Sequence, residues 1–326
     1  MILPSEETLR ALCLARGADR AALTMLGGGR EDSDGVVYRY PGREGTRVLK
    51  LLSLEGDPDK ALAANRARTD FVHYLGVHGV PIAYPLPGPD GALLALQQEG
   101  KRLYLAYETA LVPGRNPSPA ELTPALARRY GALLGMTHRL TKDYPIWKSL
   151  PSGEAELDYQ DEMGFFTALC KDERVRDHWH AMGEALAALP ISRESYGFIH
   201  NDAHSQNVLW DGQQLTLIDF DCACCQFFLQ DLVTPMQALL LPEAAGGLFT
   251  PVADPARLQA FFAAFQQGYE AENRLPDGWE GQLSLFVDYR RLLLYTILQD
   301  WLETVPDLKA AILEQMDARP AIFTTL

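Results

Sequence analysis

The sequence has no long hydrophobic run, no basic leader and few cysteines. No stretch of about 18 apolar residues, the length that crosses a bilayer, occurs in the 326 residues. The first residues, from Met1 to Glu7, lack the basic start and apolar segment of a secretory signal peptide. We therefore expect a cytoplasmic protein that is not inserted in a membrane.

The five cysteines are an odd set in a chain whose residues are 47% hydrophobic. Such a chain can build a core without disulfide bonds, so none are expected. Cys222, Cys224 and Cys225 lie close together, but their spacing lacks the second pair that a structural zinc site requires. We interpret them as small buried residues.

Positive charge is also scarce. The chain has 29 Lys and Arg against 43 Asp and Glu, which gives a net charge of −14. This charge repels nucleic-acid phosphates and anionic membrane surfaces, so neither is expected as a partner. A cationic small molecule would suit this field better, although a charge of this kind also simply keeps a protein soluble.

The first part of the chain alternates short apolar runs with glycine-rich turns. Residues 23–52 and 92–107 have the pattern of antiparallel strands. Between them, apolar residues recur at helical spacing from residue 58 until Gly79 ends the pattern. The sequence predicts an N-terminal lobe, residues 1–107, made of a small antiparallel β-sheet with one helix.

The remaining residues, 108–326, are mainly helical in pattern. Thr123 can cap a helix that begins at Pro124. Further helical patterns occupy roughly residues 161–188, 255–272 and 280–303. The only clear strand patterns here, around residues 207–210 and 215–219, predict one small hairpin. The predicted fold class is α+β, with two lobes of which the second is mainly α-helical.

A polar segment between apolar runs carries the clearest chemistry. Residues 198–210 read Phe-Ile-His-Asn-Asp-Ala-His-Ser-Gln-Asn-Val-Leu-Trp, and residues 215–221 read Leu-Thr-Leu-Ile-Asp-Phe-Asp. Phosphoryl transfer requires a carboxylate near the attacking hydroxyl and oxygen ligands that hold Mg²⁺ on the β- and γ-phosphates. Asp202, Asn207 and Asp219 supply this set.

These residues resemble the signature of the aminoglycoside phosphotransferase superfamily, His-x-Asp-x-x-x-x-Asn followed by Ile-Asp-Phe/Trp. That superfamily also contains choline kinases, homoserine kinases and a bacterial stress-response protein kinase, and it has a protein-kinase-like fold. The resemblance implies that Asp202 is the catalytic base and that Asn207 and Asp219 bind Mg²⁺. It further implies that His200 supports the loop and that ATP is the phosphate donor.

Two more carboxylates follow this signature. Asp231 resembles the buried Asp of the family that hydrogen-bonds the catalytic loop from the next helix. Asp221 lies two residues after Asp219, so on a strand both would point to the same face. Asp221 is therefore a candidate ligand of a second metal ion, with a turn residue that ends the strand as the alternative.

In the N-terminal lobe, Lys50 resembles the strand lysine that neutralises the α- and β-phosphates. An exposed lysine that protects a sheet edge is the alternative. The family usually places a Glu on the following helix to pair with this lysine, whereas this chain has Arg68 and Asp70 near that position. Asp70 is the candidate substitute, although its side chain is shorter.

Two further segments resemble nucleotide-binding parts of the family. The glycine run that includes Gly28 and Gly29 resembles the loop that covers the phosphates, and a plain hairpin turn is the alternative. Residues 107–114 resemble the hinge whose backbone binds adenine. The resemblance therefore nominates Gly28, Gly29, Glu108 and Ala110 as nucleotide-binding residues.

The phosphate acceptor is expected beside Asp202. Acidic and aromatic residues of the segment 144–166 and of the last long helix could bind an amine through carboxylates and rings. A solvated face with core aromatic residues is the alternative. The set comprises Glu154, Glu156, Asp158, Tyr159, Asp161, Glu162, Phe165, Phe166, Tyr289, Asp300, Trp301 and Glu303.

Together these features predict an ATP- and Mg²⁺-dependent phosphotransferase whose acceptor is a hydroxyl of a small molecule, similar to an aminoglycoside, choline or homoserine. A protein Ser/Thr kinase of the same fold and a pseudokinase without turnover remain open. A zinc site on His200, Asp202 and His204 is a further alternative, but it leaves Asn207 and Asp219 unexplained. Nothing in the sequence indicates the oligomeric state.

Overall fold

The computed structural model describes residues 3–29, 35–54, 58–144, 157–237 and 254–318. The chain forms two compact units. The first contains the described residues up to Gly114 together with Leu209–Asp221, and the remaining described residues form the second. The lobe boundary after residue 107 remains a prediction. The return of the chain to the first unit at Leu209 was not anticipated from the sequence.

Within its described part, the first unit has a five-stranded antiparallel sheet, two helices and a hairpin. The strands of the sheet are in the order β1-β2-β3-β5-β4. Their bounds are β1 (Thr24–Gly28), β2 (Gly35–Gly42), β3 (Gly45–Leu54), β4 (Ala95–Glu99) and β5 (Arg102–Ala110). The helices are α1 (Glu6–Arg16) and α2 (Pro58–Val77), and the hairpin consists of β7 (Val208–Trp210) and β8 (Leu215–Leu217).

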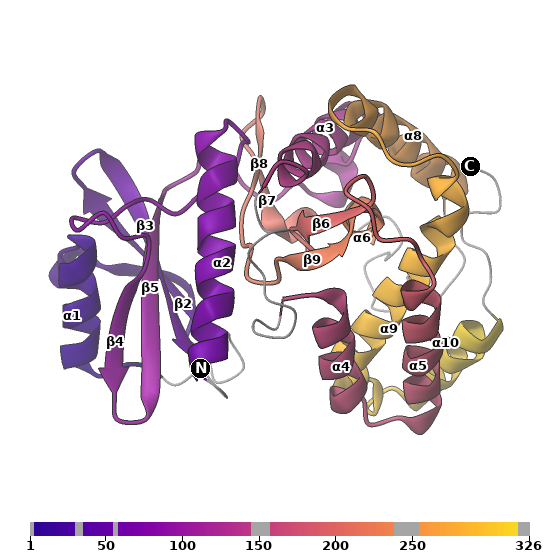
Figure 1. Cartoon of the computed structure of the whole chain (residues 1–326), viewed down its shortest axis with the longest axis horizontal. Coiled ribbons are helices and arrows are strands. Elements are labelled where there is room, and N and C mark those ends of the chain that lie inside the picture. The colour runs from indigo at the N-terminus through magenta and orange to yellow at the C-terminus, as the bar shows by residue number, and fades with distance from the viewer. Residues whose placement is uncertain (1–2, 30–34, 55–57, 145–156, 238–253, 319–326) are drawn as a thin grey trace. The chain divides into compact units, whose positions relative to one another are not determined.

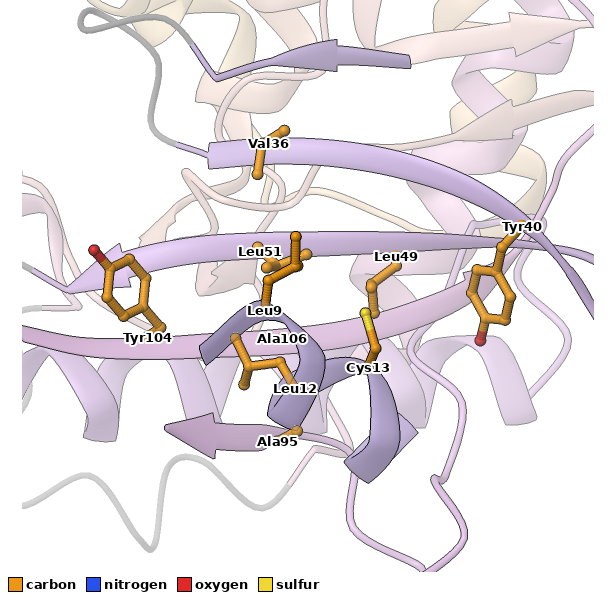
Figure 2. Packing of buried hydrophobic residues seen from close by; sticks show 10 residues of the cluster. All are labelled: Leu9, Leu12, Cys13, Val36, Tyr40, Leu49, Leu51, Ala95, Tyr104 and Ala106. Atoms are coloured by element: carbon orange, nitrogen blue, oxygen red, sulfur yellow. The ribbon is translucent and has the colours of Figure 1, made fainter. Parts of the chain in front are cut away.

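Helix α1 covers one face of the sheet, and α2 covers the other (Figure 1). The sequence predicted only one helix in this part, so α1 is a correction to that prediction. Leu9, Leu12 and Cys13 of α1 pack against Leu49 and Leu51 of β3 (Figure 2). Each fully buried Leu contributes about 1.5–3 kcal/mol to stability, which is sufficient to hold this short helix on the sheet.

Residues on the opposite face of β3 contribute to a second hydrophobic cluster and to the lining of a cavity. Successive side chains alternate along a strand, so the even-numbered residues of β3 face α2. Leu52 and Leu54 are buried, and Ala61 of α2 packs against their cluster. Val48 and Lys50, on the same face, line a cavity instead. The alternation therefore places the charged Lys50 at the cavity, while the neighbouring Leu49 and Leu51 pack against α1.

The hairpin belongs to the first unit because β8 bonds to the segment after α2. The Leu217 N–H donates to the Pro81 carbonyl at 3.0 Å, and the Ala83 N–H donates to the Leu217 carbonyl at 2.9 Å. These bonds form a short parallel bridge between Ile82 and Leu217. The bridge fixes the backbone immediately before Asp219.

The described part of the second unit is mainly helical. Its helices are α3 (Pro124–Thr141), α4 (Tyr159–Leu169), α5 (Glu173–Ala187), α6 (Phe228–Val233), α8 (Pro255–Glu272), α9 (Leu283–Leu302) and α10 (Pro306–Ala318). Two short strands, β6 (Tyr196–Ile199) and β9 (Cys224–Phe227), pair antiparallel. None of the helices in the described ranges is long and apolar enough to cross a membrane.

Two predictions for this unit need correction. The helical pattern at 161–188 is two helices, because Cys170 has extended backbone and Asp172 caps the start of α5. The pair β6–β9 was missed, since both strands are short and buried on both faces and so lack the alternating pattern of a half-exposed strand. The crowded cysteines are mixed in their burial: Cys224 and Cys225 are buried, but Cys222 is exposed.

Helices α3 and α8 lie side by side (Figure 1). Their separation at Gly131 and Gly268 is one that only glycine permits. A Cβ atom added to Gly131 would lie 1.9 Å from a carbonyl oxygen of α8, and one added to Gly268 would lie 1.9 Å from a carbonyl oxygen of α3. Farther along the same interface, the Tyr269 hydroxyl lies 2.8 Å from Nδ1 of His138. The glycines therefore allow a hydrogen bond between the two helices.

The substitution Gly268→Ala should lower the free energy of unfolding by about 2 kcal/mol or more, because the added methyl forces α3 and α8 apart. Gly164 on α4 is the matched control, since a Cβ there meets nothing within 4 Å. Gly164→Ala should raise the free energy of unfolding by up to about 1 kcal/mol through helix propensity. Denaturant titration followed by circular dichroism measures both, and equal effects would contradict the close approach.

Candidate active site

The first unit contains a cavity of about 250 Å³. Residues of the sheet, of α2 and of the hairpin line it, and most of the lining is apolar. The apolar lining includes Leu26, Val37, Val48, Val72, Leu209 and Ile218. Four charged residues, Lys50, Arg68, Asp219 and Asp221, complete it. A mostly apolar cavity with a few polar groups is typical of a small-molecule site.

Lys50 is at the centre of the charged group. Its Nζ lies 2.9 Å from Oδ1 of Asp219 and 2.5 Å from Oδ2 of Asp221, and 13% of its side chain is exposed. Burial alone would lower the pKa of Lys50, but Tyr107, Asp221 and Asp219 outweigh burial and raise that pKa well above 10.5. Lys50 is therefore a cation at neutral pH. The alternative role at a sheet edge is wrong, since β3 lies between β2 and β5.

Asp219 and Asp221 form a pair of carboxylates that suits a divalent cation. Burial is the main cause that raises the pKa of Asp221; Lys50 lowers that pKa, and the nearby charge of Asp219 raises it further. Asp219 has φ 62°, a left-handed conformation that Asp tolerates better than most residues. Its side chain is 46% exposed. Hard carboxylate oxygens with a partly exposed member fit Mg²⁺, whose charge would relieve the repulsion between them.

The two predicted hinge residues, Glu108 and Ala110, differ in their relation to the cavity. Ala110 lines the cavity, whereas Glu108 does not. The Glu108 side chain accepts a hydrogen bond from the Tyr40 hydroxyl and lies 3.8 Å from the guanidinium of Arg16. Its backbone carbonyl accepts from the Leu86 N–H at 2.8 Å. Glu108 thus fastens β5 to the α1 side of the unit.

The predicted glycine loop begins at the end of β1, where Gly28 is the last residue of the strand. Gly28 and Gly29 both have φ 74°, and a Cβ on Gly28 would lie 2.1 Å from the carbonyl oxygen of Gly35. Glycine is therefore required for this turn. Neither glycine is part of the described cavity lining. Residues 30–34 lie outside the described residues, so the phosphate-covering role remains a prediction.

Helix α2 presents a positively charged residue to the cavity, where the family usually has a Glu. Arg68 lines the cavity, whereas Asp70 is exposed and does not. Lys50 is paired with Asp219 and Asp221 instead of an acidic residue of α2. Asp70, the candidate substitute for the usual helix Glu, is therefore not the residue that pairs with Lys50 in this structure.

In the second unit, three donors surround the carboxylate of Asp202. Arg290 Nη2 lies 2.7 Å from Oδ1, and His204 Nε2 and Asn207 Nδ2 lie 3.3 Å and 3.1 Å from Oδ2. Burial raises the pKa of Asp202, but the His204 hydrogen bond and the Arg290 charge outweigh it and lower that pKa to about 2. Asp202 is therefore ionised at neutral pH.

His204 and Asn207 have defined orientations in this loop. The Gln206 N–H donates to Nδ1 of His204 at 3.1 Å, so the proton of the neutral ring lies on Nε2 and can be donated to Asp202. Asn207 also donates through Nδ2 to the Asp202 carbonyl at 2.9 Å. Its Oδ1 receives no hydrogen bond from the residues that the structure describes. An amide held in this way presents an oxygen, the atom that Mg²⁺ prefers.

Asp231 holds the backbone of the loop from α6. It is fully buried and accepts the N–H groups of His200 at 3.0 Å and of Asn201 at 2.7 Å. His138 Nε2 lies 3.1 Å from the same carboxylate. Burial lowers the pKa of His138, and Tyr269 contacts its Nδ1, so a neutral ring donates from Nε2. This network resembles the loop support predicted for Asp231.

The His200 ring also contacts the loop rather than a metal. Its Nδ1 accepts the Asp202 N–H at 3.3 Å, and the Tyr130 hydroxyl donates to the Ala203 carbonyl at 2.6 Å. Within the described ranges, no group of three or more His, Cys, Asp or Glu is arranged to hold a metal ion. The zinc alternative on His200, Asp202 and His204 is therefore wrong.

Glu162 is the acidic residue of the predicted acceptor set that reaches this loop. Its Oε1 accepts from Nδ2 of Asn201 at 2.8 Å, and its Oε2 accepts from the Tyr289 hydroxyl at 2.6 Å. Burial raises the pKa of Glu162, whereas these two hydrogen bonds and Arg290 lower it, and the net shift is upward. A buried carboxylate with two donors retains lone pairs for a further cationic group.

Other members of that set have different partners. Asp300 and Glu303 form ion pairs with lysines, and Asp158 caps α4. Glu154 and Glu156 lie outside the described residues. The interpretation of this set as a solvated face therefore applies to Asp300 and Glu303, but not to Glu162.

Arg290 is the residue of this site that sequence reasoning missed. It lies on α9 within a largely apolar run, and its side chain is 4% exposed. A charged residue that interrupts a buried apolar pattern was the only signal of it in the sequence. Asp202 and Asn207 belong to the second unit and Asp219 to the first, so the predicted convergence of these three residues remains a prediction.

The model of the phosphotransferase enzyme family matches residues 24–281. An amicoumacin kinase of Bacillus subtilis is 27% identical over 235 residues, which cover 70% of this chain and 67% of the relative. A homoserine kinase of Burkholderia lata is 28% identical over 226 residues, which cover 63% of this chain and 62% of the relative. The matched region thus spans about two thirds of these relatives or slightly less.

Solved structures show the same fold. An amicoumacin kinase in complex with AMP-PNP, Ca²⁺ and Ami has a TM-score of 0.83 at 20% identity, with coverage of 99% of this chain and 96% of that chain. A microcompartment-associated aminopropanol kinase has a TM-score of 0.66 at 16% identity, with coverage of 96% and 95%. The predicted kinase-like α+β fold and the predicted family are therefore confirmed. Since the family model spans well over half of the sequence, the chain belongs to the phosphotransferase enzyme family.

Proposed function

We propose that this protein is a kinase that transfers the γ-phosphate of ATP, with Mg²⁺, to a hydroxyl group of a small molecule. The observation that supports this most is the buried lysine of the first unit. Lys50 lies between two carboxylates in a mostly apolar cavity. This gives a cation, metal ligands and an apolar surface for the base, the combination that a metal-bound nucleotide requires. The membership in the phosphotransferase family agrees with it.

Each part of the nucleotide has a proposed contact. The apolar lining, which includes Val48 and Ile218, would receive the adenine ring, and Lys50 would neutralise the α- and β-phosphates. Asp219 and Asn207 would hold Mg²⁺, with Asp221 as a further ligand. The ion supplies positive charge that offsets the charge developing on the transferred group.

Asp202 would orient the acceptor hydroxyl and receive its proton. With a pKa of about 2 this carboxylate is ionised at neutral pH and can accept a proton, although it is a weak base. The loose transition state of phosphoryl transfer needs little base strength but strict alignment of the attacking oxygen. Arg290 and His204, which fix both carboxylate oxygens, would provide that alignment.

The acceptor class proposed is a hydroxyl compound that also carries an amine. Homoserine and aminopropanol, which name two of the related kinases, both carry these groups. Glu162 offers a buried carboxylate in the same unit as Asp202, and a carboxylate with remaining lone pairs can bind an ammonium group. The negative net charge of the chain favours the same class of acceptor.

The substitution Asp219→Asn should weaken binding of Mg²⁺-ATP by about tenfold or more and reduce turnover with it, because it removes the charge that holds the metal. Binding of metal-free ATP should change little. Titration calorimetry with and without EDTA measures both. An unchanged affinity for Mg²⁺-ATP would reject the metal assignment. Asp177→Asn, at an exposed position of α5, serves as the control.

The substitution Asp202→Asn should reduce turnover by about 10²-fold or more while Mg²⁺-ATP binding is retained. The base contacts the acceptor in the transition state, so its loss separates chemistry from nucleotide binding. A phosphotransfer assay over a panel of amino alcohols, alongside titration with a non-hydrolysable ATP analogue, measures both quantities. Full activity of the variant would reject the base role. Nucleotide binding by the parent protein without transfer to any acceptor, small molecule or protein, would favour the pseudokinase.

The substitution Arg290→Gln should shift the acid limb of the kcat/KM profile to higher pH. The Arg290 charge lowers the pKa of Asp202, so its removal lets the base become protonated at a less acidic pH. Turnover at neutral pH should fall as well, since the carboxylate loses a fixed orientation. Arg291→Gln is the matched control, because Arg291 pairs with Asp288 at 2.9 Å. Equal pH profiles for the two variants would exclude a role for Arg290 in positioning Asp202.

A further inference from the structure

Helix α2 contributes a cation to the nucleotide cavity that the proposed function does not use. Asn65, Arg68, Thr69 and Val72 line the cavity, and their spacing of three and four residues places them on one face of the helix. Thr69 donates to the Asn65 carbonyl at 2.6 Å, and Asn65 donates to the Ala61 carbonyl at 2.8 Å. These two polar side chains thus bond to their own helix, and Arg68 is the residue that brings charge to this face.

Arg68 belongs to the charged group of the cavity. It lines the same cavity as Lys50, Asp219 and Asp221, and its charge acts on the Asp221 carboxylate. Within the described lining, the cations are Lys50 and Arg68, and the acidic residues are Asp219 and Asp221. The positive and negative charges of these side chains are therefore equal in number before any ligand binds.

A nucleotide with its metal changes this balance. ATP with one Mg²⁺ retains about two negative charges, and the metal takes up the carboxylates as ligands. Both protein cations are then available to the phosphates. Lys50 provides a single ammonium, whereas a guanidinium presents two parallel N–H donors that match two phosphate oxygens.

We propose that Arg68 is a second cationic ligand of the nucleotide phosphates. This assignment rests on the proposed kinase function. It also explains why α2 presents an arginine to the cavity near the position where the family usually has a Glu. Without nucleotide, Arg68 offsets the charge of Asp221. With nucleotide bound, it bonds to a phosphate and leaves Asp221 to the metal.

Titration calorimetry of the full chain tests this with two probes, the ATP analogue AMP-PNP with Mg²⁺ and adenosine. Arg68→Gln should raise the Kd of AMP-PNP by about tenfold or more, the effect of losing a hydrogen bond to a charged group. The Kd of adenosine should stay unchanged, since it has no phosphates. Arg66→Gln, on the exposed side of the same helix, should change neither value. Arg68→Lys should recover part of the affinity for AMP-PNP, because it retains the charge.

The possible results separate the assignment from its alternatives. An unchanged Kd of AMP-PNP in Arg68→Gln would overturn the assignment while leaving the kinase function intact. Equal weakening of AMP-PNP and adenosine would also overturn it, since a loss that does not depend on phosphate indicates damage to the cavity. Failure of the parent protein to bind either probe would instead overturn the proposed function on which the assignment rests.

Discussion

The ion group around Lys50 is the constraint on which the first unit depends. A buried lysine can remain charged only if acidic groups are brought to it, and removal of one partner of such a pair costs about 3–5 kcal/mol. Asp219 and Asp221 reach Lys50 because β8 is bonded to the segment after α2. A segment more than 150 residues distant in sequence is thereby held against β3, and its residues Leu209, Ile218, Asp219 and Asp221 form part of the cavity lining.

In the second unit, a different buried group fixes the loop that carries Asp202. Asp231 accepts two backbone N–H groups and the Nε2–H of His138 on α3, and the Nδ1 of His138 contacts Tyr269 of α8, a helix that glycines bring close to α3. Each bond to Asp231 is worth about 1.5–3 kcal/mol, since one partner is charged. The loop is therefore set by helix packing some distance away, and Arg290 then fixes the carboxylate itself.

The sequence predicted what lies close together along the chain. The motif from His200 to Asp221 is nearly contiguous, and residue types with a fixed spacing were sufficient to nominate it as a site and to predict the family. The sequence did not predict that Arg68 lines the cavity, and it missed Arg290; both are placed by the face of a helix that meets a cavity or a loop. Which face that is depends on packing against elements far away in sequence. The strands β6 and β9 were missed because they are short and buried on both faces, so their residues carry no periodic signal.

The charge of the whole chain makes the buried cations necessary. A protein with a net charge of −14 repels an anionic nucleotide at long range, and salt screens this repulsion only beyond about 8–10 Å. A nucleotide bound as proposed would have this repulsion offset inside the cavity, where the dielectric constant is lower and each charge acts more strongly. Lys50 and Arg68 are the cations of the described cavity lining that would offset it. The proposed amine-bearing acceptor would meet no such barrier, since the same field attracts a cation. Under the proposed function, the negative net charge therefore requires local cations for the donor but none for the acceptor.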